Sequence, residues 1–457
     1  MKEEKRASES REDVFRISQE DVEMRSTPKT ATEFAQQRFE KPEPKRTKRK
    51  GRVLPAALTA AALIVALAAV LIAANWGKAS YTAGDLFHSG LLPVCIDGQY
   101  GFMNKKGEMQ IEPQFISAYG FDKSGLALVQ VGGRYGFVNK NGKYIVNPQY
   151  MLALPFGEGE LAAVCRGGKW GYVSKNGTET VDFSYECANG FEKQGLAAVR
   201  RDGKWGYIDQ TGAAVIDIKY DGAWDFDGEI AKVRVNDLYG FIDRAGNYVV
   251  PPELEQAELV SGDSLIVFKK DGLWGYMDRG GNVVVKPQFD NAKPFLNGRY
   301  AAVMIDGKWG FVDNKGAIVI NLKFRSAESF DTENGLALVE TGDGFGYINA
   351  RGKFETPMNY RHARPFYGAA FAAVETADGE FGYINSRGEM VIKLSQADGV
   401  GGFSQDGYAI FASGDRLGVI DRNGKVILPA ISCDINTSNF FNSMVYGGIR
   451  TEGNEWK

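Results

Sequence analysis

Histidine is nearly absent from this chain, and cysteine is rare. Only His88 and His362 occur among 457 residues, so acid–base or metal chemistry that needs paired imidazoles is not expected. The chain has four cysteines, Cys95, Cys165, Cys187 and Cys433. None of them forms a C-x-x-C motif, which argues against a zinc site or a disulfide scaffold. A bond between any two cysteines is possible outside the cytoplasm, but the sequence selects no pair.

A strong charge of one sign is missing as well. The net charge is −3, with 15 basic and 11 acidic residues in positions 1–52 and an acidic excess in the remainder. An acidic remainder lacks the basic stripe that nucleic acid needs, so nucleic acid is not expected as a partner. The chain also has no phosphate-binding loop, nucleophile elbow or dinucleotide fingerprint, and we therefore expect no cofactor and no metal.

One long uncharged run occurs near the N-terminus. Residues 1–52 are polar and end in a basic cluster from Lys45 to Arg52. They are predicted to be a largely disordered cytoplasmic tail. Residues 53–76 follow without a single charge, long enough for a transmembrane helix that ends at Trp76. The basic flank places the N-terminus in the cytoplasm and everything after the helix outside. A cleaved signal peptide is the alternative, but its apolar core is normally shorter and follows a shorter n-region.

Beyond a juxtamembrane link at 77–90, the chain repeats one pattern from 91 to 436. Its landmark is a glycine that returns every 34 to 36 residues, at Gly101, Gly136, Gly171, Gly206, Gly240, Gly275, Gly310, Gly346, Gly382 and Gly418. A fixed period in this range is typical of repeat architectures. Residues 437–457 read as a partial repeat or a cap.

A single unit reads as three short strands. In the unit at 191–220, Asp202-Gly203 favours a two-residue hairpin turn between the first two strands. Asp209 and Gly212 then occupy the first and fourth positions of a type I turn into the third strand. The predicted fold class is therefore all-β, with ten three-stranded antiparallel repeats of about 35 residues stacked like propeller blades. Both a closed ring and an open superhelical array stay possible.

The aromatic-Gly-aromatic core of the middle strand predicts how units pack. Four tryptophan–glycine pairs carry it most clearly: Trp170 and Gly171, Trp205 and Gly206, Trp274 and Gly275, Trp309 and Gly310. The glycine leaves bare backbone, against which we expect an aromatic of the neighbouring unit to lie. The tryptophans are expected to be buried there, although a lectin-like stacking surface is the alternative.

This recurring Lys-Trp-Gly core, as in Lys204-Trp205-Gly206, resembles the WG, or KWG, repeat family of bacterial proteins. The resemblance covers about 350 residues and departs locally, for example at Leu417-Gly418-Val419, where both aromatics are lost. It implies repeated β units and often a surface or envelope location. It implies no common chemistry.

Few residues stand out from the repeat as candidate sites. The Asp, Asn or Ser that follows each middle strand is predicted to cap a turn, since a general acid could not vary in this way. Arg361, His362 and Arg364 lie in the least regular unit and are the candidate ligand-binding residues, for an anionic group of a glycan or teichoic polymer.

These patterns favour a membrane-anchored, extracytoplasmic protein with a non-enzymatic binding or scaffold role in the cell envelope. Its expected partners are the lipid bilayer and an envelope protein or cell-wall polymer. Two other functions stay open: a transmembrane sensor whose tail engages a cytoplasmic partner, and a cell-wall hydrolase with residues on loops such as 359–365.

Overall fold

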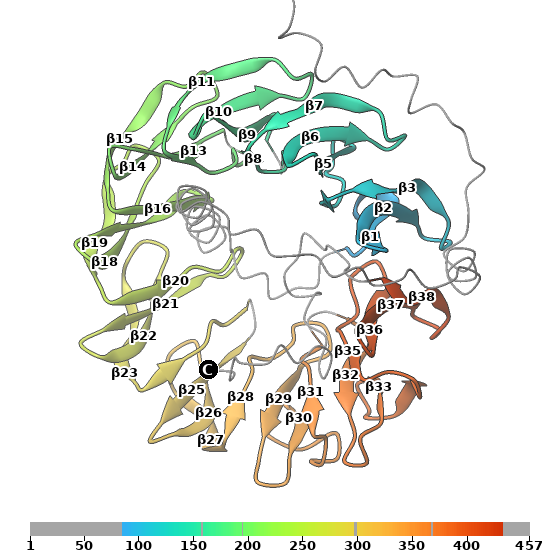
Figure 1. Ribbon diagram of the computed structural model, residues 1–457. Coiled ribbons are helices and arrows are strands. Elements are labelled where there is room, and N and C mark those ends of the chain that lie inside the picture. The colour runs from blue at the N-terminus through green and yellow to red at the C-terminus, as the bar shows by residue number, and fades with distance from the viewer. Residues whose placement is uncertain (1–84, 157–158, 194, 297–298, 367–368, 433–457) are drawn as a thin grey trace, which may run out of the picture.

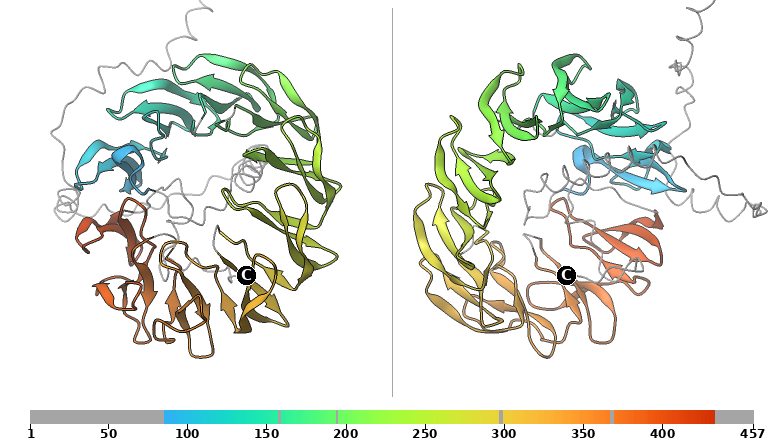
Figure 2. Two further views of the ribbon diagram at one scale, coloured as in Figure 1. Left: turned by 180° about the vertical axis from the view of Figure 1, so that it is seen from behind. Right: turned by 60° about the vertical axis from the view of Figure 1, so that its left-hand side comes forward.

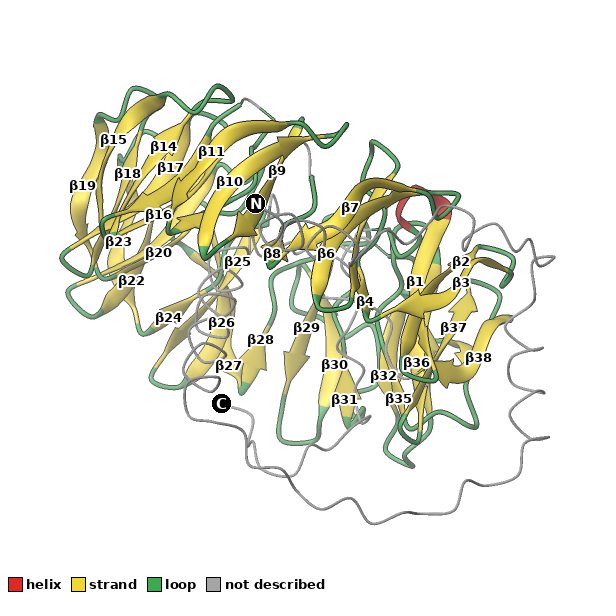
Figure 3. Cartoon of the chain, turned by 45° about the horizontal axis from the view of Figure 1, so that its top comes forward, coloured by secondary structure: helices red, strands yellow, loops and turns green. Residues whose placement is uncertain are grey.

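The computed structural model describes residues 85–432, apart from 157–158, 194, 297–298 and 367–368, and these residues form a ring of ten antiparallel sheets (Figure 1). Apart from one 3-10 turn, η2 (His88–Gly90), every regular element in this part of the chain is a strand (Figure 3). Seen from behind and obliquely, the sheets still follow one another in chain order around a common centre (Figure 2). The fold is a ten-bladed β-propeller, so the predicted all-β class is confirmed.

The blades are named 1 to 10 in chain order. Blades 1 to 5 consist of β1 (Leu91–Ile96), β2 (Gln99–Asn104), β3 (Met109–Phe115); β4 (Ser117–Ala118), β5 (Leu126–Val131), β6 (Arg134–Asn139), β7 (Tyr144–Tyr150); β8 (Leu152–Ala153), β9 (Leu161–Arg166), β10 (Lys169–Ser174), β11 (Glu179–Tyr185); β12 (Cys187–Ala188), β13 (Ala197–Arg201), β14 (Lys204–Ile208), β15 (Ala214–Tyr220); and β16 (Gly222–Asp227), β17 (Ile230–Val235), β18 (Leu238–Ile242), β19 (Tyr248–Leu254).

Blades 6 to 10 consist of β20 (Gln256–Glu258), β21 (Leu265–Lys270), β22 (Leu273–Asp278), β23 (Val283–Phe289); β24 (Asn291–Ala292), β25 (Tyr300–Ile305), β26 (Lys308–Asp313), β27 (Ile318–Phe324); β28 (Ser326–Ala327), β29 (Leu336–Glu340), β30 (Phe345–Asn349); β31 (His362–Ala363), β32 (Ala372–Glu375), β33 (Phe381–Ile384), β34 (Met390–Lys393); and β35 (Gly399–Val400), β36 (Tyr408–Ser413), β37 (Arg416–Asp421), β38 (Val426–Ser432).

The turns within a blade form where the sequence predicts them. Asp202 and Gly203 both have positive φ, of 50° and 76°, and join β13 to β14. At the next turn, Asp209 Oδ1 accepts hydrogen bonds from the backbone N–H groups of Thr211 and Ala213. Because the Thr211 hydroxyl and these N–H groups favour the charged carboxylate, the pKa of Asp209 lies below its usual value. The predicted capping role is confirmed here.

The predicted number of strands per blade is wrong for most blades. Eight of the ten described sheets have four strands, because an innermost strand, two or three residues long in all of them except blade 5, precedes the other three. In blade 4 this strand is β12, whose Cys187 and Ala188 pair with Arg200 and Val199 of β13. It forms where the chain leaves the outer strand of one blade and crosses to the centre of the next. Two residues are too few for a periodic sequence signal.

The packing partner predicted for the glycines is also wrong. A Cβ on Gly206 would lie 2.7 Å from the carbonyl oxygens of Ile216 and Asp217 and from the Cα of Ile218, all in the outer strand of the same blade. The register explains this contact: Trp205 pairs with Tyr220 and Tyr207 with Ile216, so the outer strand holds extra residues opposite the glycine. The bulge bends this strand onto the bare backbone. The glycine thus shapes its own blade instead of receiving a neighbouring aromatic.

Neighbouring blades pack through a different pair of aromatic columns. At eight of the nine interior junctions, the second aromatic of the middle strand contacts a phenylalanine that precedes the first long strand of the next blade, as Tyr172 contacts Phe191. Ring centroids lie 4.6 to 5.1 Å apart in eight such pairs, at tilted or edge angles that aromatic rings favour. All these phenylalanines are buried, so a ring contact lies in the core of each of these eight junctions, and buried Val260 takes the phenylalanine position between blades 5 and 6.

Where the second aromatic is tyrosine, its hydroxyl adds a hydrogen bond across the junction. Tyr207 donates to the carbonyl of Trp224 at 2.6 Å, and Tyr276 donates to that of Lys293 at 2.8 Å. Burial raises the pKa of Tyr207 well above its usual value, so the phenol stays protonated as the donor.

Tyr207→Phe tests this bond. We expect it to lower the free energy of unfolding by about 1 kcal/mol, because the partly buried Trp224 carbonyl loses its donor while the ring contact is kept. Chemical denaturation measures the change. Tyr248→Phe, at a half-exposed position, serves as the control and should have no measurable effect.

Several predicted segments lie outside the described residues: the tail at 1–52, the transmembrane helix at 53–76, most of the link and the partial repeat at 437–457. Within the described ranges, no helix has the length and apolar character required to cross a membrane. The last residues of the link differ from the prediction, because Leu86 and Phe87 are buried in the ring.

Candidate functional site

The residues predicted to bind an anion lie in blade 9, where two of the three meet at one carboxylate. Glu375 Oε2 lies 2.7 Å from His362 Nδ1, and its other oxygen lies 3.6 Å from an Arg361 guanidinium nitrogen. The side chains of Arg361 and His362 are more than half exposed, whereas that of Glu375 is 13% exposed. The result is an exposed cluster in which a carboxylate already occupies the position that an incoming anion would take.

Arg364 is not part of this exposed cluster. It is buried, and its carbonyl accepts the Tyr347 hydroxyl at 2.5 Å, in the junction between blades 8 and 9. The structure therefore brings Arg361 and His362 together and places Arg364 in the packing of the ring. Binding of an anion by these residues stays a prediction.

The four tryptophans occupy equivalent positions at the starts of their middle strands. Trp170, Trp205 and Trp309 are buried, and Trp274 is partly buried against the core of blades 6 and 7. Each pairs with the last residue of its outer strand, as Trp309 does with Phe324. This placement leaves little indole surface for stacking a ligand.

The tenth junction, between blade 10 and blade 1, is where the ring closes, and we call it the seam. Phe87 occupies the phenylalanine position of blade 1 and packs in one cluster with Ile410, Val419 and Leu428 of blade 10. Its ring centroid lies 4.5 Å from that of Tyr408. Val419 of β37 stands where the other middle strands have their second aromatic, so the seam takes its ring contact from Tyr408 of β36 instead. The contacts between blade 10 and blade 1 make the structure a closed ring.

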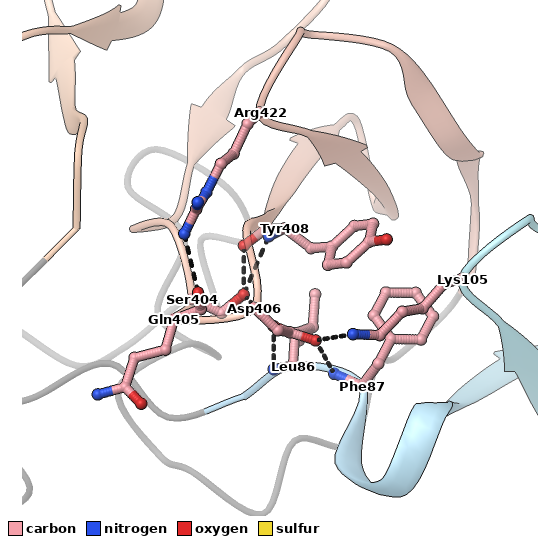
Figure 4. A network of polar contacts seen from close by, with 8 residues as sticks. All are labelled: Leu86, Phe87, Lys105, Ser404, Gln405, Asp406, Tyr408 and Arg422. Carbon is pink, nitrogen blue, oxygen red and sulfur yellow. Dashed lines mark hydrogen bonds and ion pairs between the residues drawn. The ribbon is translucent and has the colours of Figure 1, made fainter.

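Asp406 is the central polar residue of the seam (Figure 4). Its two carboxylate oxygens accept the backbone N–H groups of Leu86 at 2.9 Å and Phe87 at 3.1 Å. Lys105 from blade 1 pairs with the same carboxylate at 3.2 Å, and the Ser404 hydroxyl donates to it at 2.7 Å. Burial opposes ionisation of Asp406, but these donors outweigh it, so its pKa lies below the usual value.

The lysine–aspartate pair of the seam has counterparts inside the ring. Arg279 stands at the position of Lys105, four residues after the repeat glycine, and binds Asp227 of the preceding blade at 2.5 Å. Arg244 binds Glu192 in the same way at 3.2 Å. Each cation thus reaches the turn that follows the phenylalanine of the preceding blade. With four donors around it, Asp406 acts as a structural acceptor at the ring closure.

Sequence reasoning did not find Asp406 or Phe87. Phe87 carried a usable signal, since it precedes Gly101 by 14 residues, close to the 15 that separate Phe121 from Gly136. Asp406 carried none, because its partners in blade 1 and the segment before it lie more than 300 residues away in the chain. Among the described residues, no group of three or more histidine, cysteine or acidic side chains is arranged to hold a metal ion.

Comparison with protein families decides which repeat this is. The family model described as "WG containing repeat" matches eight segments, at residues 100–135, 135–170, 170–205, 205–239, 239–274, 274–309, 309–344 and 381–415. The chain belongs to the WG-repeat family. Each matched segment runs from one middle strand to the next, so one WG repeat combines parts of two adjacent blades.

Comparison with curated proteins found no match. Solved structures that the chain matches include the eukaryotic initiation factor, at 10% identity and a TM-score of 0.47 over 74% of this chain and 94% of that one. BamB from Moraxella catarrhalis has 14% identity and a TM-score of 0.31 over 57% and 93%. Apo AztD from Citrobacter koseri has 12% identity and a TM-score of 0.31 over 78% and 96%.

Proposed function

We propose that this chain is a single-pass membrane protein whose WG-repeat propeller lies outside the cell membrane and acts as a non-enzymatic binding or scaffold module in the envelope. The uncharged run at 53–76 behind the basic cluster supports the anchor and its orientation. The expected partner is an envelope protein or a cell-wall polymer.

One structural observation carries the binding role: the repeated side chains are used to build the ring itself. The repeat glycines lie against the backbone of the outer strand of the same blade, and the aromatic pairs lie between neighbouring blades. The turn residues accept hydrogen bonds from backbone N–H groups. What varies from blade to blade is the exposed surface of the turns and outer strands. A rigid ring with a variable surface is suited to recognition, as in other repeat proteins.

The anchor and orientation are tested on intact cells. Protease added outside should degrade the propeller but spare a tag fused to residue 1, and lysis should expose both. Protection of the propeller in intact cells would contradict the proposed location.

Binding is tested with residues 77–457 on purified wall polymers and on solubilised envelope proteins. We expect saturable binding to one class of ligand without turnover of that ligand. Loss of binding after heat denaturation is the control for a folded surface. Release of soluble wall fragments would contradict a non-enzymatic role.

If the ligand is an anionic wall polymer, the blade 9 cluster makes a directional prediction. Glu375 competes with the polymer for Arg361 and His362, so Glu375→Gln should strengthen binding by roughly threefold to tenfold. A combined Arg361→Ala and His362→Ala variant should weaken binding by a similar factor. The control is Glu380→Gln, which removes an exposed carboxylate paired with Lys393 in the same blade. Equal effects of the two Glu→Gln changes would exclude a specific site at Glu375.

A further inference from the structure

We propose that the propeller rests on the membrane surface through one arc of its rim, on blades 7 to 9. Exposed apolar side chains of this arc enter the headgroup region of the bilayer, and exposed cations beside them meet anionic headgroups. The inference refines the proposed function and rests on it, because the anchor that holds the propeller near the bilayer is part of that proposal.

The propeller has two faces that carry different connections. The turns that follow the middle strands and the turns that precede the first long strands lie on one face, here called the turn face. Arg244, in a turn of the first kind, pairs with Glu192, in a turn of the second kind, at 3.2 Å. The hairpins that follow the first long strands, such as Asp202-Gly203, lie at the opposite ends of the same strands and form the hairpin face. Every outer strand therefore begins at the turn face.

The starts of the outer strands carry most of the exposed apolar side chains. In the described part of the chain, fifteen large hydrophobic side chains are exposed, and ten of them occupy the first or second position of an outer strand. The outer strands lie at the rim of the ring (Figure 1). Phe354 has the equivalent position in blade 8, since it pairs with Ile348 as Ile318 pairs with Val312.

On blades 7 to 9, five such side chains are 37% to 50% exposed. We call them the apolar arc: Ile318, Val319, Phe354, Met390 and Val391. The hairpin end of the blades has four exposed large hydrophobic side chains, each in a different blade: Ile116, Met151, Leu238 and Leu273. Single apolar side chains are normal on a protein surface, whereas a concentration of them indicates an interaction surface.

Cations stand directly before the apolar arc. The third residue of the turn that leads into it is basic and exposed in each of the three blades: Lys315, Arg351 and Arg387. None of the ten equivalent turn positions is acidic. Carboxylates in these turns already accept hydrogen bonds. Asp313 accepts the N–H groups of Lys315 and Ala317, and Glu389 accepts the Asn385 amide at 2.7 Å.

Exposed apolar side chains flanked by basic ones are typical of surfaces that lie in the membrane interface. The apolar groups leave water for the boundary between headgroups and acyl chains, and the basic groups are attracted to anionic headgroups. Because the three cations occupy equivalent turns of consecutive blades, their attraction adds along the arc. The chemistry of the arc therefore fits an anionic lipid surface.

The chain enters the propeller on the same face. Asp406, whose carboxylate binds the N–H groups of Leu86 and Phe87, lies in a turn that precedes a first long strand (Figure 4). Eight residues separate Asp85 from Trp76, the end of the proposed membrane helix, and an extended chain of this length spans at most about 30 Å. A tether this short keeps the turn face at the seam, next to blades 7 to 9, close to the bilayer.

This orientation turns the hairpin face away from the bilayer. The blade 9 cluster lies on that face, because Glu375 is the last residue before a hairpin and Arg361 pairs with it. Contact with lipid and contact with a wall polymer would then use opposite faces of the ring.

The test uses the full-length chain in vesicles of phosphatidylcholine and phosphatidylglycerol that contain a phospholipid with a photoreactive acyl chain. Mass spectrometry locates the crosslinked residues. We expect crosslinks within 53–76 and in the apolar arc, with at least about fivefold less crosslinking at Leu238 and Leu273 on the hairpin face.

The docking and the anchor fail separately in this experiment. Crosslinks within 53–76 but none in the apolar arc, or equal crosslinking of the two faces, would overturn the docking and leave the anchor in place. Crosslinks in the arc but none within 53–76 would overturn the anchor and support the docking. Absence of both would overturn both.

A charge-reversal variant tests the cations. It combines Lys315→Glu, Arg351→Glu and Arg387→Glu, and we expect about fivefold less crosslinking in the apolar arc, with crosslinking within 53–76 unchanged. The matched control makes the same change of charge at three exposed positions of the hairpin face, as Arg134→Glu, Lys169→Glu and Lys308→Glu, and should keep the wild-type pattern. An equal loss in both variants would refute a specific role of the arc.

Discussion

Gly206→Ala is expected to lower the free energy of unfolding by about 3 kcal/mol or more, even though it adds a single methyl group. The new Cβ would meet three backbone atoms of the outer strand at 2.7 Å, a distance that real Cβ atoms do not show. Backbone cannot turn away as a side chain does, so relief requires β15 to lift off the middle strand. That movement would disturb the pairs of Trp205 with Tyr220 and of Tyr207 with Ile216.

Gly190→Ala is the matched control. Gly190 lies in the same blade, has no positive φ, and has nothing within 4 Å of the place where its Cβ would stand. We expect a change of less than about 1 kcal/mol, possible in either direction because alanine also restricts the unfolded chain. Equal losses of stability in the two variants, measured by denaturant unfolding, would show that the close approach to the outer strand is not the cause.

Asp406→Ala is expected to have the second largest effect, a loss of about 3 kcal/mol concentrated at the seam. The substitution removes a carboxylate that accepts two buried backbone N–H groups and a lysine, and hydrogen bonds to a charged partner contribute roughly 1.5–3 kcal/mol each. Hydrogen exchange should show faster exchange in blades 1 and 10 than in blade 5. Uniform acceleration around the ring would mean that the seam is not a separate weak point.

The same carboxylate predicts a pH dependence. Its pKa in the folded protein is lowered, so its contribution to stability is complete above the unfolded value near 4 and is lost as the pH falls through the folded value. The difference in stability between wild type and Asp406→Asn should therefore shrink below about pH 4. Asp415→Asn is the control: Asp415 is 88% exposed in the neighbouring hairpin and should show no such trend.

The sequence was sufficient for the features that depend on local chemistry. Asp202-Gly203 predicted its hairpin turn, Asp209 predicted its turn cap, and the period of Gly206 and its equivalents predicted the number of blades. These features depend on backbone conformation and side-chain oxygens within a few residues, which the sequence displays directly.

The features that the sequence did not predict all depend on register or on distant contacts. Because of a bulge in β15, Gly206 lies against the backbone of the outer strand of its own blade. No residue pattern in the sequence marks the extra residues of that strand. The inner strands have two residues in most blades and leave no period. The sequence predicted an anion site made of two arginines and a histidine. Glu375 lies 13 residues beyond His362, and only strand pairing brings the two side chains together.

The seam brings the two ends of the propeller together. Leu86 is bound to blade 10 and Ser432 to blade 1, so the path enters and leaves the propeller at one place. A circular permutant that joins these ends by a short linker and opens the exposed hairpin at Gly167-Gly168 should still assemble ten blades. The ring architecture would then not depend on which blade comes first in the chain.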